Sequence, residues 1–145
     1  MIKTLLAFTV LVASPALAKG TIACVGTTED YQGVGAHVDL SAHVQSNNVI
    51  YWVTLELTTN ITGENDPTQE TFETDNQEAD GDYKPRNPRY KGMNRFEVGA
   101  TEQLTLNLLL PKNFTKKTGT VRGYFQRVGH ETYPTMALTC KYKRS

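Results

Sequence analysis

The sequence has 145 residues, with 15 Lys or Arg and 15 Asp or Glu, so its formal net charge is zero. Such a balance gives no general attraction to nucleic acid or to an anionic membrane surface, and we do not expect nucleic acid as a partner. The length is typical of a single domain that buries a core of its own without several metals or disulfides.

The first 18 residues have the form of a cleavable secretory signal. Lys3 precedes an apolar stretch over residues 5–13, and Ala16-Leu17-Ala18 places small residues at the positions that a signal peptidase recognises. The apolar stretch is about half of the roughly 20 residues that a membrane-spanning helix needs. We therefore expect cleavage after Ala18 and a mature domain over residues 19–145 without a transmembrane segment. The expected location is secreted or periplasmic, and the signal has a bacterial form.

The two cysteines, Cys24 and Cys140, lie at opposite ends of the mature chain. Cys140 alternates with Met136 and Leu138, and Cys24 alternates with Ile22, so both thiols share strand faces with apolar side chains. An oxidising compartment allows such a pair to form a disulfide, which we predict to join the first and last strands. The alternative is a pair of free or reactive thiols, which strand positions without a flanking base disfavour.

Apolar and polar residues alternate through most of the mature chain, as in half-buried β-strands. The clearest pair is residues 34–45 and 49–57, separated by Asn47-Asn48, which favours a tight turn because Asn tolerates positive φ. Further strands are predicted around residues 22–24, 96–98, 104–110, 121–125 and 136–142. We predict an all-β fold, an antiparallel β-sandwich of about seven to eight strands, with a small antiparallel β-barrel as the alternative.

A charged segment over about residues 60–95 interrupts this pattern. Eight acidic residues come first and five basic residues follow, without interleaving. The segment is too polar to form a core of its own, but a structureless loop of this length is unusual in a compact domain. We interpret it as a charged insertion, parts of which, residues 71–74 and 89–98, lie on a sheet edge.

The basic half of this insertion is the first candidate for binding. Basic and aromatic side chains interleave there, and loops on a rigid scaffold often carry binding residues. Trp52 is the second candidate. If Val49, Tyr51 and Val53 face the core, Trp52 lies on the opposite, polar face of its strand, either exposed for stacking or covered by another layer. The predicted binding surface consists of Lys84, Arg86, Arg89, Tyr90, Lys91 and Trp52.

Two sets of residues are candidate metal ligands. Carboxylates are the donors that calcium prefers, and Asp75, Asp80 and Asp82 occur close together in the acidic half of the insertion. The second set, for zinc, is His37, Asp39 and His43, which share one face of a strand. The ordinary interpretation of both sets is solvated surface, so we expect no bound cofactor, with calcium as the alternative.

No motif specifies a reaction. The strand that carries His37 and His43 also contains Ser41, but a catalytic serine is normally presented on a tight turn beside oxyanion donors, and Ser41 is in mid-strand. We therefore expect an exported, non-catalytic β-domain that binds a protein or an envelope polymer. The alternatives are a calcium-dependent binding module that uses the acidic insertion and a small exported hydrolase.

Overall fold

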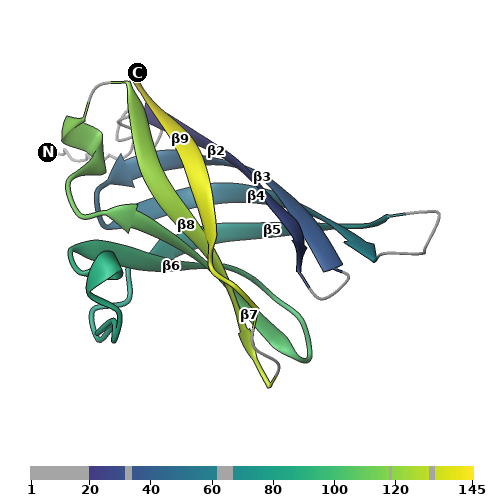
Figure 1. Ribbon diagram of the computed structural model, residues 1–145. Coiled ribbons are helices and arrows are strands. Elements are labelled where there is room, and N and C mark those ends of the chain that lie inside the picture. The colour runs from purple at the N-terminus through teal and green to yellow at the C-terminus, as the bar shows by residue number, and fades with distance from the viewer. Residues whose placement is uncertain (1–19, 32–33, 62–66, 118, 131–132) are drawn as a thin grey trace, which may run out of the picture.

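The alternating segments of the sequence all form strands. The computed structural model describes residues 20–31, 34–61, 67–117, 119–130 and 133–145, and the predicted signal peptide, residues 1–18, lies outside them. The predicted all-β class is confirmed. The eight strands, labelled as in Figure 1, are β2 (Gly20–Tyr31), β3 (Val34–Ser46), β4 (Val49–Ile61), β5 (Thr68–Glu78), β6 (Met93–Ala100), β7 (Leu104–Pro111), β8 (Thr120–Gly129) and β9 (Met136–Arg144).

The strands form one antiparallel sheet in the order β5-β4-β3-β2-β9-β8-β7-β6. Two four-stranded meanders, β2 to β5 and β6 to β9, are therefore joined by the pairing of β2 with β9. In that pair Cys24 lies directly opposite Cys140, and their sulfur atoms form a disulfide of 2.09 Å. The predicted disulfide between the first and last strands is confirmed.

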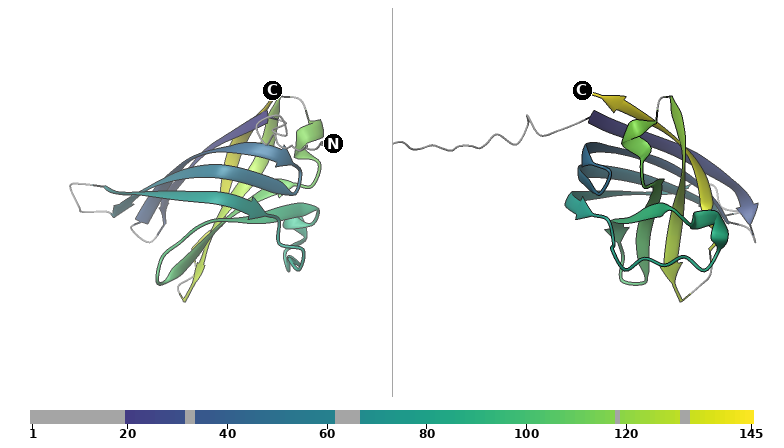
Figure 2. Two further views of the ribbon diagram at one scale, coloured as in Figure 1. Left: turned by 180° about the vertical axis from the view of Figure 1, so that it is seen from behind. Right: turned by 90° about the vertical axis from the view of Figure 1, so that its left-hand side faces the viewer.

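The two edges of the sheet, β5 and β6, curl toward each other (Figures 1 and 2). The backbone N–H of Asp80 donates a hydrogen bond of 2.9 Å to the carbonyl oxygen of Arg95, and Phe72 of β5 packs against Gly99 of β6. A Cβ atom at Gly99 would lie 3.0 Å from Cγ of Phe72, so a glycine at this position allows the close approach. The sheet is therefore nearly closed, and its form is the barrel that the sequence offered as the alternative to a sandwich.

Side chains fill the interior of this barrel, as expected for about eight strands. On β3 the predicted alternation is confirmed, since Val38 and Leu40 are fully buried while His37 and Asp39 are exposed. Other strands add their own inward residues, and the Cys24–Cys140 disulfide is part of the same cluster. The largest fully buried side chains are Phe96, Phe114, Phe125, Ile22, Leu40, Ile50, Leu55, Leu106, Leu108, Leu109, Leu110 and Met136.

One end of the barrel is covered by a short 3-10 helix, η4 (Phe114–Lys116), in the β7–β8 connection. Phe114 is fully buried, and its ring lies edge-on to that of Tyr142, 5.8 Å away. The predicted Asn47-Asn48 turn is fixed to this cover, because the side-chain oxygen of Asn47 accepts hydrogen bonds from the N–H (2.9 Å) and Oγ1 (2.8 Å) of Thr115. We call this end of the molecule, with the β5–β6 and β7–β8 connections, the covered end.

The charged segment over residues 60–95 turns out to be partly scaffold. The predicted edge strand at residues 71–74 is confirmed as part of β5, which pairs with β4 over most of its length. The second predicted stretch, 89–98, is only partly correct, because a 3-10 turn, η3 (Pro88–Tyr90), precedes β6 and the strand begins at Met93. Pro88 has no backbone N–H to donate, which suits it to the first position of a helical turn and not to a strand ladder.

Candidate functional site

The predicted basic residues lie in the connection between β5 and β6, residues 79–92. Lys84, Arg86, Arg89 and Lys91 are all exposed. The local fold follows from the sequence: Asn87 caps η3 by accepting the Arg89 N–H through Oδ1 at 3.0 Å, and Gly92, at φ +83°, supplies the left-handed residue that leads into β6.

This loop is held against the barrel by contacts at several points along it. The ring of Tyr90 lies 5.0 Å from that of Tyr124 on β8, and Tyr83 lies under the Arg95 guanidinium, 4.6 Å from the ring centroid. The Lys112 N–H donates to the carbonyl oxygen of Gly92 at 3.0 Å. Tyr90, predicted as part of the binding surface, is half-buried and packs against the barrel, whereas the four basic side chains project into solvent.

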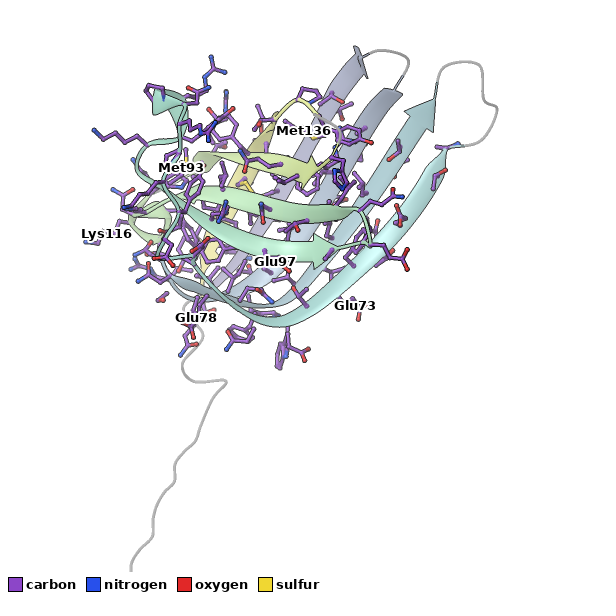
Figure 3. The ribbon with its side chains drawn as sticks, turned by 90° about the horizontal axis from the view of Figure 1, so that it is seen from below. Glu73, Glu78, Met93, Glu97, Lys116 and Met136 are labelled. Atoms are coloured by element: carbon purple, nitrogen blue, oxygen red, sulfur yellow. A yellow bond between two sulfur atoms is a disulfide. The ribbon has the colours of Figure 1, made fainter. Side chains whose placement is uncertain are left out.

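Two further basic segments are found at the covered end. The β7–β8 connection carries Lys112, Lys116 and Lys117, and the end of β9, whose Tyr142 contacts η4, carries Lys141, Lys143 and Arg144. Figure 1 places the β5–β6 connection, η4 and the C-terminus at one end of the molecule, and Figure 3 shows Met93 and Lys116 there. We call these ten exposed residues the basic end: Lys84, Arg86, Arg89, Lys91, Lys112, Lys116, Lys117, Lys141, Lys143 and Arg144.

Most of the opposite charge belongs to the first half of the chain, although two of its acids, Asp80 and Asp82, lie in the β5–β6 connection itself. Residues 20–83, which contain β2 to β5, include 12 Asp or Glu and no Lys or Arg. Residues 84–145, which contain β6 to β9, include 13 of the 15 basic residues and 3 acidic ones. The net charge of zero therefore conceals a molecule with two oppositely charged halves.

The fold keeps Asp80 and Asp82 side by side but does not gather all three candidate calcium ligands into one group. Asp75 lies within β5, whereas the Asp80 carboxylate forms an ion pair with Arg95 and also accepts the backbone N–H of Asp82 at 2.9 Å. The hydrogen bond from Arg95 is the main reason that the pKa of Asp80 lies below its usual value, and the Asp82 N–H adds to the effect. Within the ranges that the structure covers, no three His, Cys, Asp or Glu side chains are grouped closely enough to hold a metal ion.

The polar face of β3 is open to solvent on the outside of the barrel. Nδ1 of His37 lies 2.7 Å from Oγ1 of Thr27, and the His43 ring stacks on that of Tyr51 at 5.4 Å. In the described part of the chain, no hydrogen bond joins Ser41 to either histidine. His37, Asp39 and His43, the candidate zinc ligands, are therefore spread along one strand.

On β4 the predicted orientation is confirmed for Trp52, which faces outward, and for Val53, which faces the core, but it is wrong for Ile50 and Tyr51. Ser41 pairs with Thr54 but His43 pairs with Tyr51, so β4 has one residue more than β3 between these pairs, which is a β-bulge. Trp52 occupies the bulge with φ +49°, the only positive φ of a non-glycine residue in the described chain. As a result Ile50 is buried, and both Tyr51 and Trp52 lie on the outer face.

These outward rings form a cluster that the sequence did not reveal. Trp52 is 62% exposed. Its ring lies 5.2 Å from that of His43, at 86°, and 5.1 Å from that of Tyr51, at 67°. The indole thus stands at a steep angle to the stacked pair of His43 and Tyr51, and we call this arrangement the aromatic corner. A bulge has no local sequence signal here, since no glycine marks it, and only the pairing register reveals it.

Sequence reasoning also missed Arg127, which points into the barrel near the end opposite the covered one. It is only 7% exposed, and its guanidinium lies 4.3 Å from the centroid of the Tyr133 ring. Burial lowers the pKa of Arg127, and the neighbouring Tyr133 opposes this effect. The alternation along β8, with Phe125 inward, could have indicated this orientation.

The surface clefts are shallow and polar. One of about 430 Å³ follows the outside of the seam between β5 and β6, where Figure 3 shows Glu78 and Glu97. Its single basic residue, Arg95, is already paired with Asp80. The cleft is lined by Gln77, Glu78, Asp80, Arg95, Glu97, Thr105, Asn107 and Val128.

Comparison with known proteins gives no further guidance to the role of these surfaces. Among the described residues, no helix has both the length and the apolar character needed to cross a membrane. No protein-family model matches the chain, and no curated protein or solved structure shows significant similarity to it.

Proposed function

We propose that this chain is an exported, non-catalytic binding module whose basic end binds an acidic polymer of the cell envelope. The observation that carries the proposal is the convergence of ten exposed Lys and Arg side chains, from three separate segments, at the covered end of the barrel. A basic surface of this kind raises the local concentration of a polyanion and accelerates its association.

The scaffold under this surface supports the proposal. The contacts of Tyr90 with Tyr124 and of Tyr83 with Arg95 hold the β5–β6 loop against the barrel, so little of its conformational freedom remains to be lost on binding. Within this loop the charge of Asp80 is compensated by its ion pair with Arg95. The cations of the loop remain free of such a carboxylate among the described residues, since the ion pair of Arg95 with Asp80 is the only one found there.

The proposal is tested with a variant in which Lys84, Arg86, Arg89 and Lys91 are all replaced by Gln. Binding to a dye-labelled poly-glutamate is measured by fluorescence anisotropy at low and at near-physiological salt. Four lost charges should weaken binding by about tenfold or more, and the difference should shrink as salt screens the charges.

A charge-preserving control separates charge from shape. The double variant Arg86→Lys with Arg89→Lys keeps every charge and should bind nearly as well as the wild type. The midpoint temperature of thermal unfolding of the Gln variant should stay within a few degrees of the wild-type value, because exposed charges contribute only about 0–1 kcal/mol each to stability. Normal folding with undiminished binding to the polyanion would show that the function lies elsewhere.

A further inference from the structure

The outer face of β3, β4 and β5 combines aromatic rings with carboxylates and has no Lys or Arg. Neither cation occurs anywhere in residues 20–83, so no basic side chain of these strands neutralises the face. Its exposed carboxylates, with the aromatic corner among them, are Asp39 on β3, Glu56 on β4, and Glu73 and Asp75 on β5.

The strand register brings two of these carboxylates to the aromatic corner. Tyr51 pairs with Asn76 and Val53 pairs with Thr74, which places Asp75 level with Trp52 on the neighbouring strand. Neighbouring strands lie about 4.8 Å apart, so the Asp75 carboxylate and the indole are adjacent on one surface. Glu73, which pairs with Thr54, is the next outward residue along β5.

Trp52 is kept in this place against local preference. A positive φ is a rare conformation for a bulky residue, and it occurs here at a side chain that is 62% exposed and therefore contributes little to the core. The bulge also turns Tyr51 outward beside it. The conformation thus places two aromatic rings, the exposed Trp52 and the half-buried Tyr51, on the outer face where a regular strand would have placed one.

We infer that the aromatic corner, together with Asp75 and Glu73, binds a cationic side chain, the guanidinium or ammonium group of a basic peptide segment. An aromatic face attracts a cation through its quadrupole, and an adjacent carboxylate adds a hydrogen-bond acceptor of the required charge. A neutral ligand such as a sugar could use the ring face and donate hydroxyl hydrogen bonds to the carboxylates, but it would gain no charge attraction from them, whereas a cation gains both. This site lies on the acidic half of the molecule and is independent of the basic end proposed above.

Trp52 is the only tryptophan of the chain, so its fluorescence reports directly on the site. A tetra-arginine peptide is the probe. Titration into the wild-type protein should produce a saturable change in Trp52 emission, and the change should weaken as salt is added. A neutral oligosaccharide should produce none.

Variants then assign the binding to the corner. Asp75→Asn should raise the dissociation constant of tetra-arginine, followed by anisotropy of a labelled peptide, roughly threefold to tenfold, and Trp52→Ala should have a similar effect. Glu70→Gln is the matched control. It removes one exposed charge from the same strand but pairs with Leu57, five residues from Trp52, about 16 Å along the strand and beyond the Debye length of about 8 Å. Its effect should be under about twofold.

Three results would overturn the inference. The first is an unchanged Trp52 emission with tetra-arginine. The second is an equal loss of affinity in Asp75→Asn and Glu70→Gln, which would reduce the effect to general charge attraction. The third is a larger saturable change with the neutral oligosaccharide. Because Asp75 is exposed, its variant remains informative even if Trp52→Ala does not fold. If the test of the basic end failed, this result would not be affected, because the two tests use probes of opposite charge and different variants.

Discussion

Asn47 and Thr115 are 68 residues apart in sequence, yet one side-chain oxygen of Asn47 accepts hydrogen bonds from both the backbone N–H and the hydroxyl of Thr115. Both residues are half-buried, and the bonds join the β3–β4 turn to η4 at the covered end. Asn47→Ala should lower the free energy of unfolding by about 1–3 kcal/mol, because it leaves the Thr115 N–H without its acceptor. Urea denaturation measures the change.

Asn48→Ala is the matched control for this prediction. The Asn48 side chain accepts one hydrogen bond, from Asn94, at 3.1 Å, and Asn48 is exposed. Asn94 also donates to the backbone oxygen of Asn47 at 2.8 Å, a bond that this variant keeps. The control should therefore lose less stability than Asn47→Ala. Equal losses would mean that the turn itself, and not its bonds to Thr115, is what matters.

The sequence could predict those parts of the fold that depend on local alternation. On β3, successive residues point to opposite faces, so the buried Val38 and Leu40 and the exposed His37 follow from the period of two. The disulfide followed from the same rule, since Cys24 and Cys140 both share faces with apolar residues. Asn47-Asn48 was predicted as a turn because Asn suits turns, but its bonds to Thr115 depend on a segment far away in the chain.

The parts that could not be predicted depend on how strands pair. On β4 a single extra residue at Trp52 reverses the alternation, so Ile50 faces the core and Tyr51 faces solvent, contrary to the predicted assignment. Side chains alternate between the two faces of a strand, so the direction of each one follows from that of its neighbour. One bulge therefore reverses the predicted direction of every side chain beyond it. The basic end is a similar case. Its loop was visible as Lys84–Lys91, but its union with Lys112 and Lys141 required the topology.

Acid titration of Asp80 tests the ion pair that fastens the β5–β6 loop. The Arg95 hydrogen bond holds the pKa of Asp80 below its ordinary value of 3.8, with the Asp82 N–H as the second cause. A lowered pKa in the folded state means that the pair contributes stability above the ordinary value and loses it as the pH falls through the lowered one. Because the carboxylate is open to solvent, we expect a small effect on global stability and a clear effect on the local titration.

Arg95→Met removes the donor and keeps a long apolar side chain over Tyr83. The pKa of Asp80, followed by carboxyl-carbon NMR, should rise toward its ordinary value. Lys112→Gln is the control, since Lys112 lines the same cleft as Asp80 but forms no ion pair with it. It should change the titration less. An Asp80 titration that is the same in wild type and Arg95→Met would show that the pair does not persist in solution.

The last prediction concerns the conformation of Trp52. It separates the effect of this conformation on stability from the role of the indole in binding. At φ +49° any side chain with a Cβ atom is strained, whereas glycine is not. Trp52→Gly should therefore be more stable than Trp52→Ala by about 1 kcal/mol, even though both remove the same exposed ring.

Tyr51 provides the control with the opposite sign. It has no positive φ, so Tyr51→Gly should be less stable than Tyr51→Ala by about 0.5–1 kcal/mol, the usual penalty for glycine within a strand. Urea denaturation of the four variants gives both differences. Both Trp52 variants should weaken tetra-arginine binding by the same factor, because both remove the ring that we infer to contact the cation. If Trp52→Gly is the less stable of its pair, the bulge is not strained in solution, and the exposed indole needs no function to explain its conformation.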